Sequence, residues 1–260
     1  MEIIGRGFLA RSLGPVARRH PGTVAVAAGV SWASQTSAED FARERALLRE
    51  TARRCRADGS RLLFFSTAAT ALYGPLAGPA REDGPVRPLN LYGAHKLALE
   101  EWLRASGTRH LTLRLGHLVG PGQPPHQLVP SLVAQVRQGA VRIHRGAARD
   151  LLHVEDAVTL FGHLLARAPD GAIVNVASGH AAPVTGIVDH LARRLGVEPR
   201  RTYAEAGAAG AAAPPVSTAR LRALVPEAAE LGFGPGYHRL VLDRYLGAAG
   251  AAPPEPVPCR

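Results

Sequence analysis

Short apolar runs alternate with segments of helical periodicity along most of the chain, and this alternation restricts the possible folds more than any other feature. The apolar runs lie at residues 2–5, 23–29, 61–66, 111–116, 141–144 and 172–177. The helical segments, in which apolar residues recur every three or four positions, lie at 9–16, 39–57, 92–103, 127–138, 154–167 and 184–195. This pattern predicts repeated strand-helix-strand units, and therefore an α/β fold around a parallel sheet with right-handed crossovers.

Length and composition indicate a globular protein of one large or two small domains. The 260 residues are 46% hydrophobic and 20% charged, which suffices for a core without disulfides. The formal net charge of +10 comes from scattered arginines, so we expect an anionic small-molecule substrate or a merely basic surface rather than nucleic acid. Cys55 and Cys259 form no disulfide framework, and we find no signal peptide and no membrane-spanning run. We therefore expect a cytoplasmic protein without membrane contact.

The turn after the first apolar run has the spacing of a dinucleotide-binding fingerprint. In IIGRGFLA, small residues at Gly5, Gly7 and Ala10 permit a tight turn, close approach of a pyrophosphate and close helix packing. An ordinary strand-to-helix turn is the alternative. The fingerprint also expects an acidic residue about 20 positions later to bind the adenosine ribose. No acidic residue occurs between Glu2 and Glu39, so either a phosphorylated cofactor meets a cation there, or this half of the site is reduced. The candidate cations are Arg6, Arg18 and Arg19.

Tyr92 and Lys96, in the stretch LNLYGAHKLALEE, lie one turn apart on the same face of a predicted helix. Lys96 is the only lysine among the 31 lysine and arginine residues. A neighbouring ammonium favours the phenolate of a tyrosine and so lowers its pKa from about 10. The phenol can then exchange a proton with a substrate oxygen while a nicotinamide moves a hydride. A chance pair on a surface helix is the alternative, but the glycine turn and the hydroxyls that follow the run at 61–66 argue against it.

Seven segments in sequence order together resemble the NAD-dependent epimerase/dehydratase family, the extended short-chain dehydrogenases. They are IIGRGFLA, TVAVAAG, LLFFSTAATALYG, LYGAHKLALE, LTLRLGHLVGPGQ, RDLLHVEDAV and IVNVASG, and the resemblance extends over about residues 1–246. It implies a Rossmann-like NAD(P)-binding domain at 1–121 and 151–182, and a smaller substrate-binding region at 122–150 and 183–246. It also implies NAD or NADP as cofactor and a homodimer formed through the helix at 39–57 and the helix that carries Tyr92. The low-complexity stretches at 206–215 and 248–258 predict a poorly ordered loop and, over 247–260, a flexible tail.

The same resemblance implies roles for individual residues. Tyr92 is the expected acid/base, Lys96 its pKa-lowering and ribose-binding partner, and Thr67 the catalytic hydroxyl, with Ser66 and Thr70 as alternatives. Cofactor contacts are expected at Gly5, Gly7, Phe8, Leu9, Ala27 and Ala28, together with Tyr92 and Lys96.

Two further positions are expected to bind substrate. Arg149 stands where relatives contact the diphosphate of a sugar nucleotide, and a salt bridge to Asp150 or Asp156 is the alternative role. His117 stands where relatives often place a substrate-contacting asparagine, and a neutral surface exchange is the alternative there.

The chain departs from the family pattern in two places. Gly5 and Tyr92 are much closer in sequence than in typical relatives, and TVAVAAG resembles the family's fourth strand. We therefore predict a shortened, doubly wound parallel sheet in which the second and third strand units are missing, with a thinner adenosine pocket and weaker or altered cofactor binding. The second departure concerns the hydroxyl, because counting back from the Tyr73-Gly74 pair reaches Ala69 rather than Thr67.

The residues after the expected hydroxyl indicate the type of reaction. Dehydratases of the family resemble one another in carrying acidic residues there, whereas this chain has Ala68 and Ala69. We expect simple hydride transfer at a secondary alcohol or ketone of a sugar nucleotide or a similar anionic, for example secondary-metabolite, substrate. A reduced adenosine pocket favours a ketoreductase, which exchanges its cofactor at each turnover, over an epimerase, which retains it. The alternative function is a binding or scaffolding protein without redox activity. The eleven histidines lack ligand spacing, so we expect no metal site.

Overall fold

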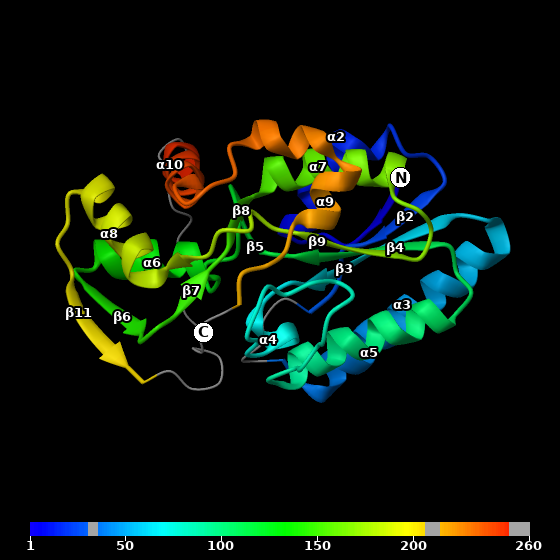
Figure 1. Ribbon diagram of the computed structural model, residues 1–260, viewed down its shortest axis with the longest axis horizontal. Helices are drawn as coiled ribbons and strands as arrows, with labels where there is room; N and C mark the ends of the chain where they lie inside the picture. The colour runs from blue at the N-terminus through cyan, green and yellow to red at the C-terminus, as the bar shows by residue number, and fades with distance from the viewer. Residues whose placement is uncertain (31–35, 206–213, 250–260) are drawn as a thin grey trace.

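A five-stranded parallel sheet forms the centre of the protein (Figure 1). The computed structural model describes residues 1–30, 36–205 and 214–249. The strand order is β1-β2-β3-β4-β9, which is also the order along the chain. The strands are β1 (Glu2–Ile4), β2 (Thr23–Val26), β3 (Arg61–Thr67), β4 (His110–Leu115) and β9 (Ala172–Val176). The predicted α/β class and parallel sheet are confirmed, and β1 is an edge strand that pairs directly with β2.

Helices cover both faces of this sheet. Helices α1 (Phe8–Ser12), α2 (Gly14–Ala17) and α7 (Val154–Arg167) lie on one face, and α3 (Ala38–Asp58) and α5 (Leu91–Ala105) lie on the other (Figure 1). Successive strand residues point to opposite faces, so Leu63 and Phe65 of β3 pack in the core with α1, α2 and α7. Leu62 and Phe64 pack with α3 and α5. Because both faces are covered, the strands read as continuous apolar runs in the sequence.

The connections between the strands do not all have the same hand. Strands β1, β2 and β3 are parallel and follow one another in one direction across the sheet. The β1–β2 connection passes through α1 and α2 on one face, whereas the β2–β3 connection passes through α3 on the opposite face. Two such connections have opposite hands, so the expectation of uniformly right-handed crossovers is wrong. The helix pair stays on the α7 face because its apolar side chains Leu13 and Val16 belong to that core.

The helix predicted at 9–16 is divided into two short helices. Helix α1 ends at Ser12, and α2 begins at Gly14 with Pro15 in its first turn. Proline has no N–H to continue the hydrogen-bond ladder of a preceding helix, but it is well suited to the start of a new one. The apolar periodicity therefore identified the buried face correctly but overestimated the length of the helix.

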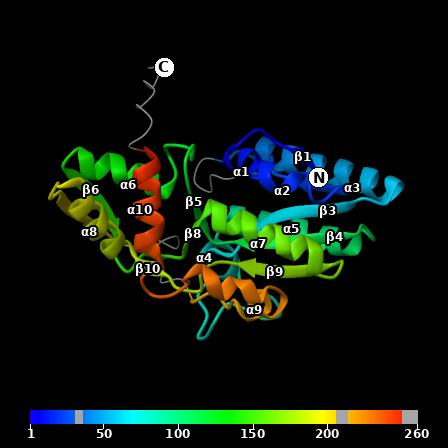
Figure 2. The ribbon, with the colours of Figure 1, turned by 90° about the horizontal axis from the view of Figure 1, so that it is seen from above.

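A second group of elements lies beside the main sheet (Figures 1 and 2). Three pairs of short strands are formed by β5 (His117–Val119) with β8 (Leu151–His153), β7 (Ala148–Arg149) with β10 (Ala182–Pro183), and β6 (Ala140–His144) with β11 (Arg200–Ala204). The helices are α6 (Leu128–Arg137), α8 (Val184–Leu195) and α10 (Tyr237–Ala249). The remaining elements are α4 (Thr70–Tyr73), α9 (Ala219–Leu224) and the 3-10 helix η2 (Pro226–Leu231). Among the described residues no helix is both long and apolar enough to cross a membrane.

The two low-complexity stretches fall largely outside the described residues. The structure does not describe residues 206–213 and 250–260. The predicted tail began at residue 247, but residues 247–249 continue helix α10. The alanine-rich start of the tail therefore extends the helix, because alanine has the highest helix propensity.

Candidate active site

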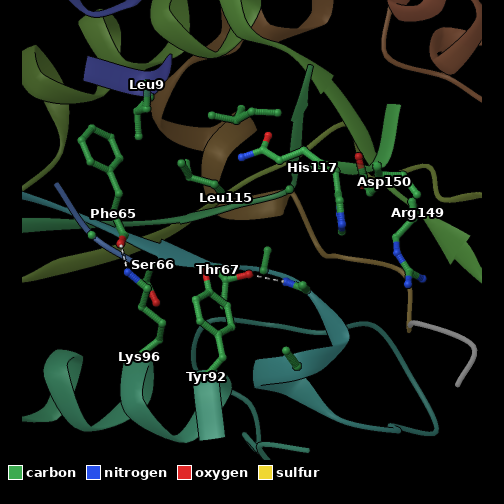
Figure 3. A pocket seen from close by; sticks show the side chains of 18 of the residues that line it. Leu9, Phe65, Ser66, Thr67, Tyr92, Lys96, Leu115, His117, Arg149 and Asp150 are labelled. Carbon is green, nitrogen blue, oxygen red and sulfur yellow. Dashed lines mark hydrogen bonds between the residues drawn. The ribbon is translucent and has the colours of Figure 1, made fainter. Parts of the chain in front are cut away.

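A cavity of about 510 Å³ opens at the carboxyl ends of β2, β3 and β4 (Figure 3). In parallel α/β sheets this edge is where ligands bind, because the loops that follow the strands meet there. The glycine turn, the end of β3 and helix α5 form one side of the cavity, and β5 and β7 form the other. The sequence-predicted residues that line it are Gly7, Phe8, Leu9, Ala27, Ser66, Thr67, Thr70, Tyr92, Lys96, His117 and Arg149.

The glycine turn is built as the fingerprint requires. Gly5 has a φ of +136°, and a Cβ on it would lie 2.4 Å from the carbonyl oxygen of Ala27. Only glycine therefore allows β1 and the end of β2 to approach so closely. A Cβ on Gly7 would have no atom within 4 Å, so the backbone there is open toward the cavity. Gly5 and Ala28 do not themselves line the cavity, and Gly29 and Val30 contribute in place of Ala28.

Helix α5 places Tyr92 and Lys96 under the cavity. Asn90 caps the helix, with its side-chain oxygen accepting the N–H of Gly93 at 2.9 Å. A Cβ on Gly93 would lie 1.8 Å from the carbonyl oxygen of Ala71, so the first turn of α5 packs directly against the backbone of α4. This contact fixes the start of the helix, and with it the direction in which Tyr92 points toward the end of β3 (Figure 3).

Lys96 is buried, and its ammonium is held by two acceptors. Nζ donates to Glu44 Oε1 of α3 at 2.7 Å and to the carbonyl oxygen of Phe65 at 3.2 Å. Only 3% of the residue is exposed. Glu44 was not predicted from the sequence, although it lies one turn before Leu48 on the face of α3 that the apolar periodicity marks as buried. A charged residue on a predicted buried face is the signal that could have identified it.

The surroundings of Tyr92 act on its pKa in opposite directions. Burial raises the pKa of the phenol above its ordinary value, and the charge of Lys96 lowers it. The charge of Glu44 raises the pKa further, whereas the neighbouring Thr67 hydroxyl lowers it. The net direction is upward, so the predicted effect of Lys96 on Tyr92 is present but burial outweighs it.

Three hydroxyls lie at the end of β3, and the structure gives them different surroundings. The Thr67 side chain lowers the pKa of the neighbouring Tyr92 phenol, and its Oγ1 accepts the N–H of Ala69 at 3.1 Å. Ser66 Oγ is buried and has no hydrogen-bond partner among the described residues. Thr70 begins helix α4 and is also buried. Ala68 and Ala69 form the turn between the end of β3 at Thr67 and the start of α4 at Thr70.

His117 and Arg149 face the cavity from the side opposite Tyr92 (Figure 3). Burial and the charge of Arg149 lower the pKa of His117 to about 4, so the imidazole is neutral near pH 7. Burial also lowers the pKa of the Arg149 guanidinium. The two acidic residues proposed as alternative partners are bound elsewhere: Asp150 accepts from Ser178 and Gly179, and Asp156 from Tyr237 and Arg244.

The candidate cations for a cofactor phosphate are divided between the two ends of the sheet. Arg19 lines a polar hollow with Thr23, Arg61 and Asp170, which stand before or at the start of their strands. The cavity lies at the opposite, carboxyl ends, so Arg19 cannot serve it. Arg6 is exposed between Gly5 and Gly7, and Arg18 directly follows helix α2, next to Arg19. In the described part of the chain no three His, Cys, Asp or Glu side chains form a metal-binding group.

Comparison with known proteins finds a matching family, proteins of similar sequence and solved structures of similar fold. The model of the NAD dependent epimerase/dehydratase family matches residues 15–177. A GDP-6-deoxy-D-mannose reductase of Pseudomonas aeruginosa is 31% identical over 150 residues, which cover 52% of this chain and 49% of the reductase. A UDP-glucose 4-epimerase of Streptomyces lividans is 33% identical over 162 residues, which cover 52% of this chain and 48% of the epimerase. The solved structure of MoeE5 in complex with UDP-glucuronic acid and NAD has a TM-score of 0.75 at 26% identity, covering 95% of this chain and 85% of MoeE5.

The sequence matches and the structural match cover different shares of the chains that are compared. The chain spans about half the length of the curated relatives it matches. The structural similarity nevertheless extends from the sheet into the second group of elements, since it covers almost the whole chain. The family model starts at residue 15, after the glycine turn, and includes the β3 hydroxyls and the Tyr92-Lys96 pair. From the match over more than half of its length, together with the parallel sheet, the chain belongs to the NAD-dependent epimerase/dehydratase family.

Proposed function

We propose that this protein is an NAD(P)-dependent oxidoreductase that transfers a hydride at a secondary alcohol or ketone carbon of a nucleotide sugar. The observation that carries the proposal is that Tyr92, Lys96 and Thr67 meet at one cavity, which also reaches the glycine turn. A half-buried phenol beside an ammonium and a hydroxyl can hold and exchange one proton. The named relatives, a sugar-nucleotide reductase and a sugar-nucleotide epimerase, support the substrate class.

The residues present fit a nicotinamide dinucleotide. Gly7 offers open backbone for a pyrophosphate, and Ser66 Oγ is a buried hydroxyl whose hydrogen-bond capacity is unused among the described residues. Lys96 has three N–H donors, of which Glu44 and Phe65 engage two, so one remains for a ribose hydroxyl. Gly7, Phe8, Leu9, Ser66 and Lys96 would therefore hold the cofactor, which when bound supplies or accepts the hydride.

The proton of the reaction is assigned to Tyr92. In the reductive direction the carbonyl carbon gains a hydride, the C=O π bond breaks, and the oxygen takes the proton of Tyr92 Oη. The resulting phenolate is stabilised by the charge of Lys96 and by the neighbouring Thr67 hydroxyl, both of which lower the pKa of Tyr92. In the oxidative direction the same phenolate takes the proton of the alcohol. Ala68 and Ala69 line this part of the cavity and carry no second proton donor, which supports hydride transfer without dehydration.

The opposite side of the cavity is suited to an anionic substrate. Arg149 and His117 line this side. Near pH 7 the Arg149 guanidinium is charged, whereas the His117 imidazole is neutral. We assign Arg149 to the diphosphate of the substrate and His117 to a polar group next to it. A reductase that exchanges its cofactor is favoured over an epimerase, because β1 is an edge strand and no further strand lies beside it to carry an adenosine pocket in the described residues.

Titration with NADH and NADPH, followed by fluorescence, tests the proposal. Binding at micromolar to millimolar concentration is expected for at least one of them, and addition of a nucleotide-linked 4-keto sugar should then oxidise the bound cofactor. Failure to bind either cofactor would refute the enzymatic function and leave a binding or scaffolding role. Retention of tightly bound NAD through purification, with epimerase activity, would favour the epimerase.

A further inference from the structure

Glu44 is a buried carboxylate that the mechanism above does not use, although it lies against the ammonium of Lys96. Its Oε2 accepts the N–H of Val30 at 3.1 Å and lies 3.0 Å from His95 Nε2. The Glu44 and Lys96 side chains are 2% and 4% exposed. Burial alone would raise the pKa of this carboxyl, but the hydrogen bonds from His95 and Lys96 and the charge of Lys96 lower it to about 2. Glu44 is therefore ionised over the whole working range of the protein.

The ion pair between Glu44 and Lys96 occupies space that a side chain at residue 29 would otherwise fill. A Cβ on residue 29 would lie 2.4 Å from Glu44 Oε1 and 3.1 Å from Lys96 Nζ, so Gly29 is the residue that lets the carboxylate and the ammonium meet. Helix α3 carries Glu44 and helix α5 carries Lys96, and the two helices pack side by side on one face of the sheet (Figure 1). The pair thus joins three separate segments directly beneath the cavity.

The other groups around Lys96 do not replace this counter-charge. Nζ lies 5.8 Å from the centre of the Tyr92 ring and 5.3 Å from that of Phe64. His95 is bound to Glu44 itself, β3 offers the carbonyl oxygen of Phe65, and Tyr73 of the adjoining helix α4 is bound to Asn175 and Arg114. Within the described ranges, Glu44 is the anionic group that faces the ammonium.

We propose that Glu44 is a positioning residue, which keeps Lys96 protonated and directs its remaining N–H toward the cavity. With one donor on Glu44 and one on Phe65, the ammonium cannot rotate freely, and the third donor is left for the cofactor ribose. The catalytic consequence rests on the proposed function, because it is through Lys96 that Glu44 acts on the cofactor and on Tyr92. The effect on the protonation of Lys96 is independent of that function.

Removal of the Glu44 charge should make the stability of the fold depend on pH in a distinctive way. In Glu44→Gln the ammonium is a buried charge without a counter-charge, and burial favours the neutral amine. The folded variant then binds fewer protons than its unfolded chain, in which lysine titrates near about 10.4. Because the unfolded state binds more protons, stability rises with pH up to that value. The variant should therefore be destabilised most near neutral pH and less toward about pH 10.

Glu100→Gln is the matched control for this measurement. Glu100 is also a buried carboxylate in an ion pair, with Arg114 Nη2 at 2.6 Å and both side chains at most 3% exposed. A guanidinium does not release its proton in proteins, so the stability lost in Glu100→Gln should not vary over the same pH range. The experiment is urea unfolding of the full chain, Glu44→Gln and Glu100→Gln at several pH values from neutral to alkaline.

The unfolding midpoints decide the inference. A loss in Glu44→Gln that shrinks as the pH rises, beside a constant loss in Glu100→Gln, supports it, and equal constant losses in both variants overturn it. Adding Lys96→Met to Glu44→Gln should remove the pH dependence and restore part of the stability, because no charge is left unpaired. If Glu44→Gln does not fold, folding of that double variant supports the inference and its failure to fold overturns it.

Cofactor binding gives a second readout. NADH affinity of the parent protein should be constant between about pH 7 and about pH 9, whereas that of Glu44→Gln should fall about tenfold as the amine loses its proton. A constant affinity in the variant overturns the positioning role. If the parent binds neither NADH nor NADPH, the proposed function fails, but the unfolding experiment still decides whether Glu44 controls the charge of Lys96.

Discussion

Replacement of Lys96 by arginine tests whether this lysine is a chemical requirement or an accident of composition. The substitution keeps the charge but adds two heavy atoms and a planar head group. The ammonium is enclosed by Glu44 at 2.7 Å, by the Phe65 carbonyl at 3.2 Å and by the bare Cα of Gly29. With the residue 3% exposed, the larger guanidinium has to displace one of these neighbours or extend into the cavity that Lys96 lines.

The magnitude follows from overpacking on the side of Lys96 that Glu44, Phe65 and Gly29 enclose. Extra atoms in a well-packed core cost about 1–3 kcal/mol, so Lys96→Arg should lower the free energy of unfolding by that amount. In a chain of this size each kcal/mol lowers Tm by roughly 2–4 °C. NADH affinity should fall at least about tenfold, which corresponds to about 1.4 kcal/mol, because the donor that faces the cavity is displaced.

Differential scanning calorimetry and NADH titration measure these two effects. Arg104→Lys exchanges the same two residue types at an exposed position of the same helix, and it should change stability by less than about 0.5 kcal/mol. Unchanged Tm and unchanged NADH affinity in Lys96→Arg would refute the reasoning, because the site would then accept either cation.

Other consequences of the structure are open to direct measurement. Tyr92→Phe should leave NADH affinity nearly unchanged and reduce turnover by orders of magnitude; retained turnover in a stopped assay would place the acid/base elsewhere. Because the pKa of Glu44 is lowered from 4.5 to about 2, its contribution to stability, about 3 kcal/mol, is present above about pH 4.5 and disappears as the pH falls toward 2. Urea unfolding across that window should show this loss in the parent protein and not in Glu44→Gln. The negative charge of UDP should raise the pKa of His117 from about 4, so the binding of UDP near pH 5.5 should be accompanied by uptake of a proton. Calorimetry in buffers of different ionisation enthalpy measures this uptake, and His117→Asn should abolish it. Gly93→Ala would place a Cβ 1.8 Å from Ala71 O, so it should lower Tm, and an unchanged Tm would show that α4 adjusts without cost.

The sequence predicted the sheet well because its strands are buried on both faces. Strand β9 and helices α7 and α8 have almost the predicted bounds, since their apolar residues directly record what they pack against. The short pairs β5–β8 and β7–β10 were not predicted. Strands of two or three residues have too little periodicity to be recognised, and their partners are distant in sequence.

The candidate site was predicted unevenly for a similar reason. The spacing of the motifs identified Tyr92, Lys96 and the hydroxyls. Tyr92 and Lys96 are one turn apart on a single helix, and the hydroxyls lie close together at the end of a single strand, so their proximity does not depend on how the elements pack. Glu44 was missed, because its meeting with Lys96 depends on how α3 packs beside α5 and on the absence of a side chain at Gly29. The sequence could not exclude Arg19 as a partner of a cofactor phosphate, because its position at the amino ends of the strands is known only from the structure.

The order of the strands also affects the entropy of assembling the sheet. Each strand pairs with the one that precedes it in the central sheet, and the loops that these pairings close grow longer along the chain. The shortest joins Glu2 to Val24 and the longest Leu111 to Ala172. The entropy cost of closing a loop rises with its length, so the pairing nearest the N-terminus costs least and each later pairing costs more. A chain synthesised from that end can therefore add its strands one at a time, each to an edge that is already formed.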